Sequence, residues 1–352
     1  MSSTRLVPET RLMACEELTA DDAWRTLRRH GGWHLLRDAF VRFRYGDGFS
    51  HSRALALQLC LAVVPFLIAL TGLIGDLSGQ RGGRVIAETV VAITPGSSED
   101  LVHSLLDNQG HSADTGELAL VLGLLTGLVA LTTTMAQIER GANRIYGVER
   151  DRPVLRKYVR ASILAVCAGV PALVGFLILV AGRPLGNAVQ RNYEWGWWAN
   201  TAWAVVRWPL SLGLTVFAVA VLFRHAPRRQ QPGLSWLLFG ASIGTALWWL
   251  ASLLLAGYVR FSGSFGQTYG QLTGMMALLL WANLTGVALF GGLSFGAQLE
   301  ALRVGVRDPA QPDRWEPVVA AEPGAAGGKP GAVAAEPGAA AAEPGVPEPM
   351  IG

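Results

Sequence analysis

The side chains of this sequence that could do chemistry within a membrane are polar groups set inside long apolar segments. Gln58, Asn283 and Gln298 each interrupt such a segment, and Pro65 removes a backbone donor from the middle of the first one. A polar group without a partner is costly in lipid, so these residues should pair between helices or line a wet cavity. We expect them to lie on a substrate pathway, with interhelical hydrogen bonding and ordinary helix packing as the alternative.

The sequence lacks the patterns that hydrolysis, phosphoryl transfer and metal chemistry require. Its six histidines fall in no H-E-x-x-H motif, and its three cysteines form neither a metal knuckle nor a disulfide framework. A phosphate-binding G-x-x-x-x-G-K-[ST] and a G-x-S-x-G nucleophile motif are absent as well. We therefore expect a protein that is not an enzyme and that holds no metal or other cofactor.

Six segments are long enough to cross the hydrocarbon core of a bilayer, which takes about 20 apolar residues. They cover residues 54–74, 118–135, 159–181, 201–223, 233–256 and 272–299. Hydrophobic residues make up 51% of the chain and charged residues only 16%, which is more apolar than a soluble core needs. The sequence predicts an all-α integral membrane protein with a six-helix transmembrane domain at residues 53–302.

Arginines mark one end of the predicted bundle. Seven lie between residues 25 and 53, before the first segment, and six lie between residues 140 and 160, after the second. Basic residues beside transmembrane segments stay in the cytoplasm, and 23 of the 29 Lys and Arg residues fall on that side of a six-pass chain. The abundance of Arg, Ala and Gly suggests a bacterial source. We expect a plasma (inner) membrane protein with both termini in the cytoplasm.

This distribution of charge also bears on partners. The basic residues gather at helix ends and not on one phosphate-binding face, so nucleic acid is not an expected partner. Membrane lipids and other envelope proteins are the expected partners, and the oligomeric state is left open.

The segments outside the bundle are amphipathic or of low complexity. In residues 1–52, Trp24, Trp33 and Phe40 recur at helical spacing among arginines, which predicts helices on the inner membrane surface, broken at Gly31-Gly32. The loop at residues 76–117 predicts two further short amphipathic helices on the outer surface. Residues 303–352 are rich in Pro, Gly, Ala and Glu, which predicts a disordered tail.

Small residues and charges at helix ends suggest how the helices pack. Three G-x-x-x-G pairs put two glycines on one helix face. They are Gly123 and Gly127, Gly240 and Gly244, and Gly292 and Gly296. We expect close packing within the bundle, with dimerisation as the alternative. Glu139 and Glu300 lie at predicted helix ends close to Arg140 and Arg303, and we expect interfacial ion pairs there, with proton carriers as the alternative.

Two stretches carry a resemblance to a known family. Residues 141–153 read GANRIYGVERDRP, and later residues include Trp248-Trp249, Tyr258, Tyr269-Gly270, Trp281 and GAQLE at 296–300. In this combination the chain resembles the YihY/virulence factor BrkB family over roughly residues 33–302. It departs from the family where many members have paired tyrosines and a serine before the proline, with Leu57, Gln58 and Ala62. It also has Gln298 where members commonly carry a glutamate.

The resemblance implies a multi-pass inner-membrane protein. Members have been labelled ribonuclease BN, apparently through misassignment, and have been linked to serum resistance and to envelope lipid movement. We expect this chain to handle an amphipathic, lipid-like envelope substrate, and Tyr269 and Trp281 join Gln58, Pro65, Asn283 and Gln298 as candidates for its pathway. A membrane scaffold that recruits partners through its basic loop and tail is the alternative. A membrane-associated ribonuclease is more distant, because it needs clustered acids or histidines with metals.

The signature itself suggests a second site. Asn143 and Tyr146 contribute nothing to membrane orientation, whereas arginines bind lipid phosphates through paired hydrogen bonds. We expect Asn143, Arg144, Tyr146 and Arg150 to form a head-group or partner site at the cytoplasmic mouth of the bundle. The alternative is that the loop only fixes orientation.

Overall fold

The computed structural model describes residues 4–9, 19–76, 85, 89, 113–193, 196–262 and 272–311. Helices dominate this part of the chain, and an isolated antiparallel bridge joins Thr4 to Ala310. Three predictions fall outside the described residues. They are the disordered tail after Gln311, the pathway candidate Tyr269, and nearly all of the two helices predicted at residues 76–117.

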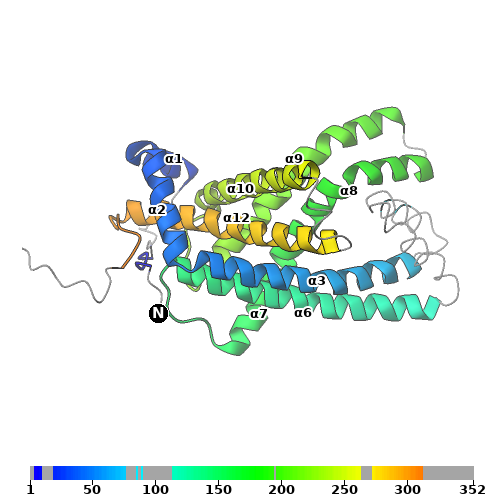
Figure 1. Ribbon diagram of the computed structural model, residues 1–352, viewed down its shortest axis with the longest axis horizontal. Helices are drawn as coiled ribbons and strands as arrows, with labels where there is room; N and C mark the ends of the chain where they lie inside the picture. The colour runs from blue at the N-terminus through cyan, green and yellow to red at the C-terminus, as the bar shows by residue number, and fades with distance from the viewer. Residues whose placement is uncertain are drawn as a thin grey trace, which may run out of the picture. The chain divides into compact units, whose positions relative to one another are not determined.

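Six helical spans are long and apolar enough to cross a membrane, which confirms the predicted all-α membrane fold (Figure 1). Their bounds are α3 (Gly48–Asp76), α6 (Ala113–Ile145), α7 (Val154–Leu164) continuing through η3 (Ala165–Gly169) into α8 (Val170–Tyr193), α9 (Trp197–His225), α10 (Leu234–Phe261) and α12 (Thr273–Arg303). The helices extend beyond the apolar segments because a helix continues through polar turns at a membrane surface.

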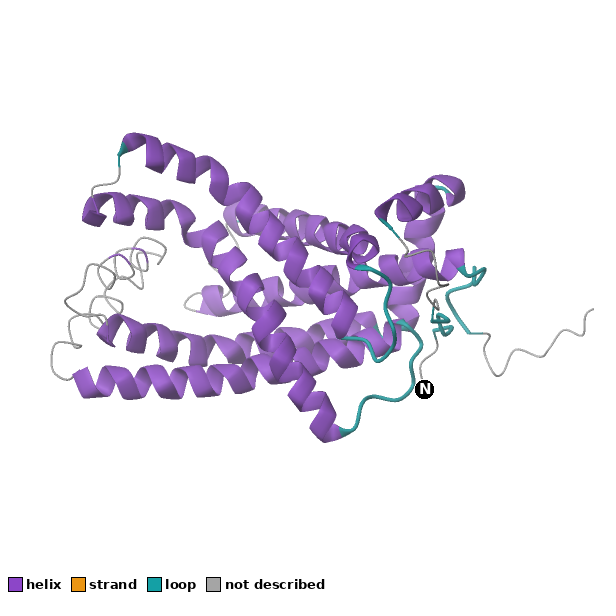
Figure 2. Ribbon diagram, turned by 180° about the vertical axis from the view of Figure 1, so that it is seen from behind, coloured by secondary structure: helices purple, strands orange, loops and turns teal. Residues whose placement is uncertain are grey.

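Glycines hold two helix pairs close together. α3 and α6 run side by side in Figures 1 and 2, and a Cβ added at Gly123 would lie 2.6 Å from the Cα of Ala69. α10 and α12 meet in the same way, because a Cβ at Gly292 would lie 2.5 Å from the Cα of Gly244. These contacts confirm the predicted intramolecular packing of the G-x-x-x-G pairs, since only a missing side chain allows such backbone approach.

Two short helices lie against one end of the bundle. α1 (Ala20–His30) and α2 (Gly32–Tyr45) are separated by Gly31, whose φ of 76° favours glycine. The predicted break is therefore confirmed. Trp24 of α1 packs on Phe239 of α10 at 6.4 Å between ring centroids, and Phe43 of α2 packs on Phe49 at 4.8 Å.

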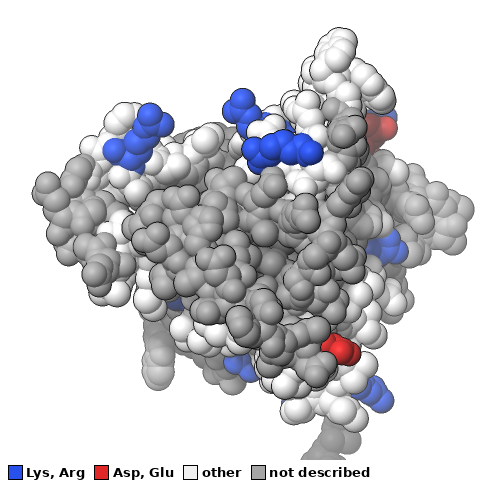
Figure 3. Space-filling view, turned by 90° about the vertical axis from the view of Figure 1, so that its right-hand side faces the viewer, with Lys and Arg blue, Asp and Glu red and all other residues white. Residues whose placement is uncertain are grey.

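At this end α3, α7 and α10 begin and α6, α9 and α12 finish, and it carries the predicted cytoplasmic arginines; we call it the basic end. Figure 3 faces the opposite end, where the Lys and Arg side chains of the described residues are scattered.

Candidate functional site at the basic end

Two of the predicted pathway residues, Gln58 and Trp281, form hydrogen bonds between helices. Gln58 of α3 accepts a hydrogen bond from Thr133 Oγ1 of α6 at 3.0 Å, which is the interhelical pairing expected as the alternative to a pathway. Trp281 of α12 donates to Ser252 Oγ of α10 at 3.2 Å, and its ring lies 5.3 Å from that of Phe176 of α8, between centroids. These contacts tie α3 to α6 and α12 to its neighbours.

Two further candidates have no such hydrogen bond among the described contacts. Pro65 lies inside α3, where the Leu61 carbonyl therefore lacks its usual helical donor. Asn283 lies half-buried on α12, about 30 Å along the helix from Arg303.

Gln298 lies apart from the others, in a buried polar cluster at the basic end. Its Oε1 accepts from Arg42 Nε at 2.8 Å, and its Nε2 donates to the Arg307 carbonyl at 3.0 Å. Arg42 is itself fully buried and also donates to the carbonyls of Arg5 and Ile145. Burial lowers the pKa of Arg42 to about 10, so its guanidinium still carries a positive charge at neutral pH.

A buried ion pair lies in the same cluster. Arg229 donates two hydrogen bonds to the Glu300 carboxylate, at 2.5 and 3.0 Å, and both side chains are almost completely inaccessible. The Arg229 guanidinium also stacks over the ring of Tyr146, 4.6 Å from its centroid. Burial, and then the charge of Glu300, raise the pKa of Tyr146, so its phenol stays neutral.

Glu300 forms an ion pair as predicted, but its partner is Arg229 and the pair is buried instead of lying at the interface near Arg303. The nearby Arg303 instead lies 3.6 Å from Asp22 of α1. Arg303 follows Glu300 by three residues on the same helix, but it lies on the exposed side, whereas the loop after α9 brings Arg229 into the interior.

The N-terminal segment at residues 4–9 crosses this cluster. Val7 is buried and its amide donates to the Tyr146 carbonyl at 3.1 Å, while the Arg5 amide donates to the Pro309 carbonyl at 3.0 Å. Gly147 has a φ of 78°, and a Cβ there would lie 2.7 Å from the Cα of Leu6. The sequence gives no sign of this contact, because residues 4–9 have no apolar periodicity.

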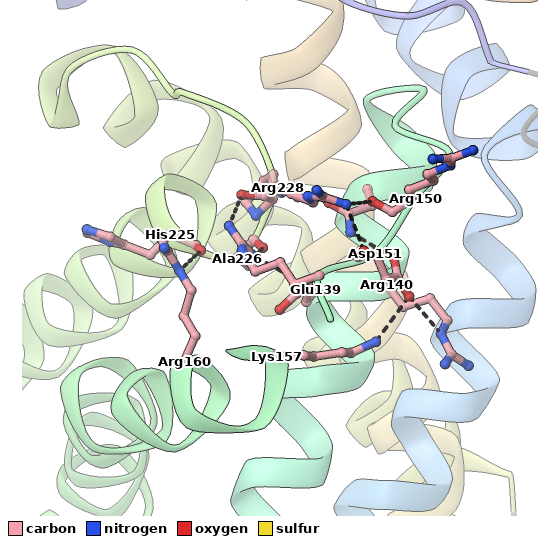
Figure 4. A network of polar contacts seen from close by, with 12 residues as sticks. Glu139, Arg140, Arg150, Asp151, Lys157, Arg160, His225, Ala226 and Arg228 are labelled. Carbon is pink, nitrogen blue, oxygen red and sulfur yellow. Dashed lines mark hydrogen bonds and ion pairs between the residues drawn. The ribbon is translucent and has the colours of Figure 1, made fainter. Parts of the chain in front are cut away.

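The loop between α6 and α7 forms a second network, centred on Asp151 (Figure 4). Asn143 Nδ2 donates to Asp151 Oδ1 at 2.9 Å, and Lys157 Nζ donates to Asp151 Oδ2 at 3.1 Å. Burial acts to raise the pKa of Asp151, but these hydrogen bonds and the charges of Lys157 and Arg140 together hold it below its ordinary value. The carboxylate is thus ionised and fixes the start of α7.

Glu139 pairs with Arg152 at 3.1 Å, and the predicted pairing with Arg140 was wrong. Arg140 instead lies 3.5 Å from Asp151. Arg152 reaches inward because its guanidinium also donates to the carbonyls of Ala226 and Pro227 after α9.

The signature residues expected to form a head-group site have mainly internal contacts. Asn143 is fully buried and its Oδ1 accepts from the Arg228 amide at 2.7 Å, while Tyr146 is buried with the Arg229 guanidinium over its ring. Arg144 Nη1 donates to the Glu149 carbonyl, and the Arg150 carbonyl accepts from Arg228. The described contacts therefore assign Asn143 and Tyr146 a role in holding the loop to the bundle.

An apolar groove opens on the side of the bundle near the basic end. It has a volume of about 390 Å³ and lies among α2, α10, α12 and the first turn of α3. Its lining residues are all apolar: Leu36, Ala39, Phe40, Phe43, Phe49, Ile243, Leu247, Leu250, Ala251, Leu254, Leu284, Val287, Ala288, Gly291 and Phe295. The sequence did not predict this groove, because the apolar residues of α2 have the spacing of a helix that lies on the membrane surface.

Within the described residues, no three or more His, Cys, Asp or Glu side chains come together as metal ligands. The groups that a ligand could meet among the described residues of this end are its arginines and its apolar surfaces.

Comparison with known proteins shows one family. The profile of the family described as Virulence factor BrkB matches residues 39–317. The chain is 26% identical over 265 residues to a Bacillus subtilis protein named putative ribonuclease-like protein YfkH, covering 75% of this chain and 94% of that protein.

Longer relatives are also similar to this chain. It is 26% identical over 295 residues to a UPF0761 membrane protein of Chromohalobacter salexigens, covering 80% of this chain and 66% of that one. It is 27% identical over 279 residues to UPF0761 membrane protein azo3165 of Azoarcus sp., covering 76% and 65%. The chain thus spans just under two thirds of these two relatives. No solved structure matches it significantly.

Proposed function

The chain belongs to the virulence factor BrkB family of multi-pass membrane proteins, and from that premise we propose that it binds and handles an amphipathic, lipid-like molecule of the membrane. The apolar groove among α2, α10 and α12 carries the proposal. Along α10 the groove extends from Ile243 to Leu254, about 16 Å at the rise of an α-helix. That length matches roughly half of a 30 Å hydrocarbon core, the depth of one leaflet.

The composition of the groove suits an acyl chain. Its walls offer no hydrogen-bonding side chain, so a polar ligand would lose its hydration there without compensation. Its volume of about 390 Å³ falls within the range of small-ligand sites. An exposed apolar helix face is ordinary in lipid, but a hollow closed on one side by the surface helix α2 can hold a single chain apart from the bulk.

The location of the groove suits an amphipathic ligand. It begins beside α2, where Arg37 and Arg44 are exposed, and continues toward the middle of α10. A head group at the membrane surface and an acyl chain in the groove would each lie in a matching environment. We further propose that the protein lies in a bacterial inner membrane with the basic end and both termini in the cytoplasm, which the distribution of arginines supports.

Photocrosslinking in nanodiscs tests the proposal. A phospholipid with a diazirine in one acyl chain should label peptides from the groove walls, especially residues 243–254. Ala251→Trp places a large side chain in the groove and should lower that labelling severalfold. Ala256→Trp is the matched control, because Ala256 lies exposed on the same helix and is not part of the lining.

Two further measurements check that the variants fold and whether the protein moves lipid. Both variants are compared with wild type by size-exclusion chromatography and thermal unfolding, so that loss of labelling is not mistaken for loss of fold. Movement is then measured as the dithionite-accessible fraction of a fluorescent phospholipid in proteoliposomes, which should rise above that of protein-free vesicles. Labelling spread evenly over all lipid-facing helices, unchanged by Ala251→Trp, would refute binding in the groove.

A further inference from the structure

Four arginines line a second pocket, on the side of the bundle where α7 begins. The pocket has a volume of about 580 Å³ and is lined by Arg152, Arg156, Arg160, Arg228, Pro153, Leu155, Val159 and Ile163. No acidic residue lines it. It shares no residue with the apolar groove, so an inference from it rests on separate observations.

The spacing along α7 creates two parallel stripes. Arg156 and Arg160 lie four residues apart on α7, and Leu155, Val159 and Ile163 recur at the same spacing. Arg152 lies just before the helix, which begins at Val154. Residues four apart lie on one face of a helix, so a basic stripe runs beside an apolar one. Leu155, Val159 and Ile163 are all more than half exposed, which fits a surface covered by lipid chains.

Two of the four arginines, Arg160 and Arg228, are held in place by backbone carbonyls without being neutralised. Arg160 Nε donates to the His225 carbonyl at 3.2 Å, and Arg228 Nη1 donates to the Asp151 carbonyl at 2.8 Å. Carbonyls orient a guanidinium but supply no opposite charge. Among the described residues, Arg156, Arg160 and Arg228 form no ion pair with a carboxylate, and only Arg152 does, with Glu139. Three positive charges are therefore left to a ligand.

Such an arrangement is unfavourable in an empty site. Like charges four residues apart on a helix, as Arg156 and Arg160 are, repel each other and destabilise it. A phosphate between them would reverse that repulsion, and guanidinium groups bind phosphate oxygens through paired hydrogen bonds. A membrane-orientation signal needs charge only, whereas this pocket presents fixed donors around a hollow with an apolar wall.

We propose that this pocket binds the phosphate head group of an anionic phospholipid, with an acyl chain lying along Leu155, Val159 and Ile163. The phosphate lies among Arg156, Arg160 and Arg228, and the chain enters the bilayer along the apolar stripe of α7. A phospholipid of the adjacent leaflet is the ligand, because a free phosphate would leave that exposed stripe unused.

Native mass spectrometry of the purified full chain tests the proposal. Dioleoylphosphatidylglycerol should bind at least tenfold more tightly than dioleoylphosphatidylcholine, whose head group is zwitterionic. Each arginine beside an anionic lipid contributes roughly fivefold in affinity. Arg156→Gln and Arg160→Gln together should therefore lower phosphatidylglycerol binding about twentyfold, while Arg→Lys at the same positions should restore only part of it.

A matched control removes the same charge elsewhere. Arg25→Gln with Arg29→Gln takes two exposed arginines from α1, outside both pockets, and should leave binding within about twofold. The single variant Arg156→Gln serves if the double variant folds poorly, because the Arg156 side chain makes none of the described contacts. Equal losses in the control and pocket variants would show a diffuse charge effect and overturn the proposal.

Two further arms identify the ligand. Leu155→Ser with Val159→Ser should weaken phosphatidylglycerol binding although all the arginines remain. Millimolar inorganic phosphate should displace little bound lipid, and full displacement would mean a phosphate site without a lipid ligand. Ala251→Trp should leave the preference for phosphatidylglycerol over phosphatidylcholine unchanged, because no charged residue among those described lines the groove, so failure of the groove and failure of this pocket give different results.

Discussion

Replacing Glu300 by alanine should destabilise the protein by about 3–5 kcal/mol, because it leaves the charge of Arg229 buried without its partner. The side chains of Arg229 and Glu300 are 2% and 0% exposed, so solvent cannot take over the lost contact. The remaining interactions of Arg229, with the Pro8 carbonyl and the face of Tyr146, hold the guanidinium in the interior. Glu300→Gln should cost less, because an amide oxygen still accepts one of the two hydrogen bonds.

A double-mutant cycle separates the pair from its surroundings. Arg229→Met with Glu300→Leu removes both charges and should be less destabilised than the sum of the single variants Arg229→Met and Glu300→Leu by at least about 2 kcal/mol. Unfolding by SDS in mixed micelles, followed by tryptophan fluorescence, gives the free energies. Arg303→Ala is the control, since its contact with Asp22 is partly exposed and should contribute no more than about 1 kcal/mol.

Additive losses of stability in the two single variants would refute the coupling between Arg229 and Glu300. If the double variant loses as much as the two single variants together, Arg229 and Glu300 are not coupled. If Arg303→Ala costs as much as Arg229→Met, burial of the Arg229–Glu300 pair does not explain the loss of stability.

Three further predictions concern a glycine contact, the Asp151 network and the orientation in the membrane. Gly292→Ala should destabilise the protein by about 1–3 kcal/mol in the same SDS titration, because the added Cβ meets the backbone of Gly244, whereas Gly213→Ala, with open space around it, should be neutral or stabilising. The pKa of Asp151 lies below its ordinary value of 3.8, so ionised Asp151 stabilises the fold above pH 3.8, and this contribution is lost as the pH falls through the pKa of the folded state. Asp151→Asn should therefore lower the free energy of unfolding at pH 7 and make it less dependent on pH in the acid range. Single cysteines at Ser98 and Asn192, in a background without the native cysteines, should react with an impermeant maleimide on intact cells while one at Asp151 should not, and the reverse pattern would overturn the proposed orientation.

The sequence by itself determined the features that depend on short-range chemistry. Apolar length predicts the six spans, because each helix satisfies its own backbone hydrogen bonds in lipid. Gly31 predicts the break between α1 and α2, because its backbone conformation is a local steric matter. The paired glycines predict close helix contacts for the same kind of reason, although they do not say which helices meet.

Only the tertiary structure decided which polar groups meet. Glu300 is 71 residues from Arg229, and Gln298 is 256 residues from Arg42, so helix register and the path of the loops bring them together. Sequence proximity suggested Arg303 and Arg140 as partners, but a neighbour on the same helix can lie on the solvent side while a distant loop reaches the interior. The apolar groove and the arginine pocket have the same origin. Each depends on how one helix is placed against others, and no local pattern specifies that placement.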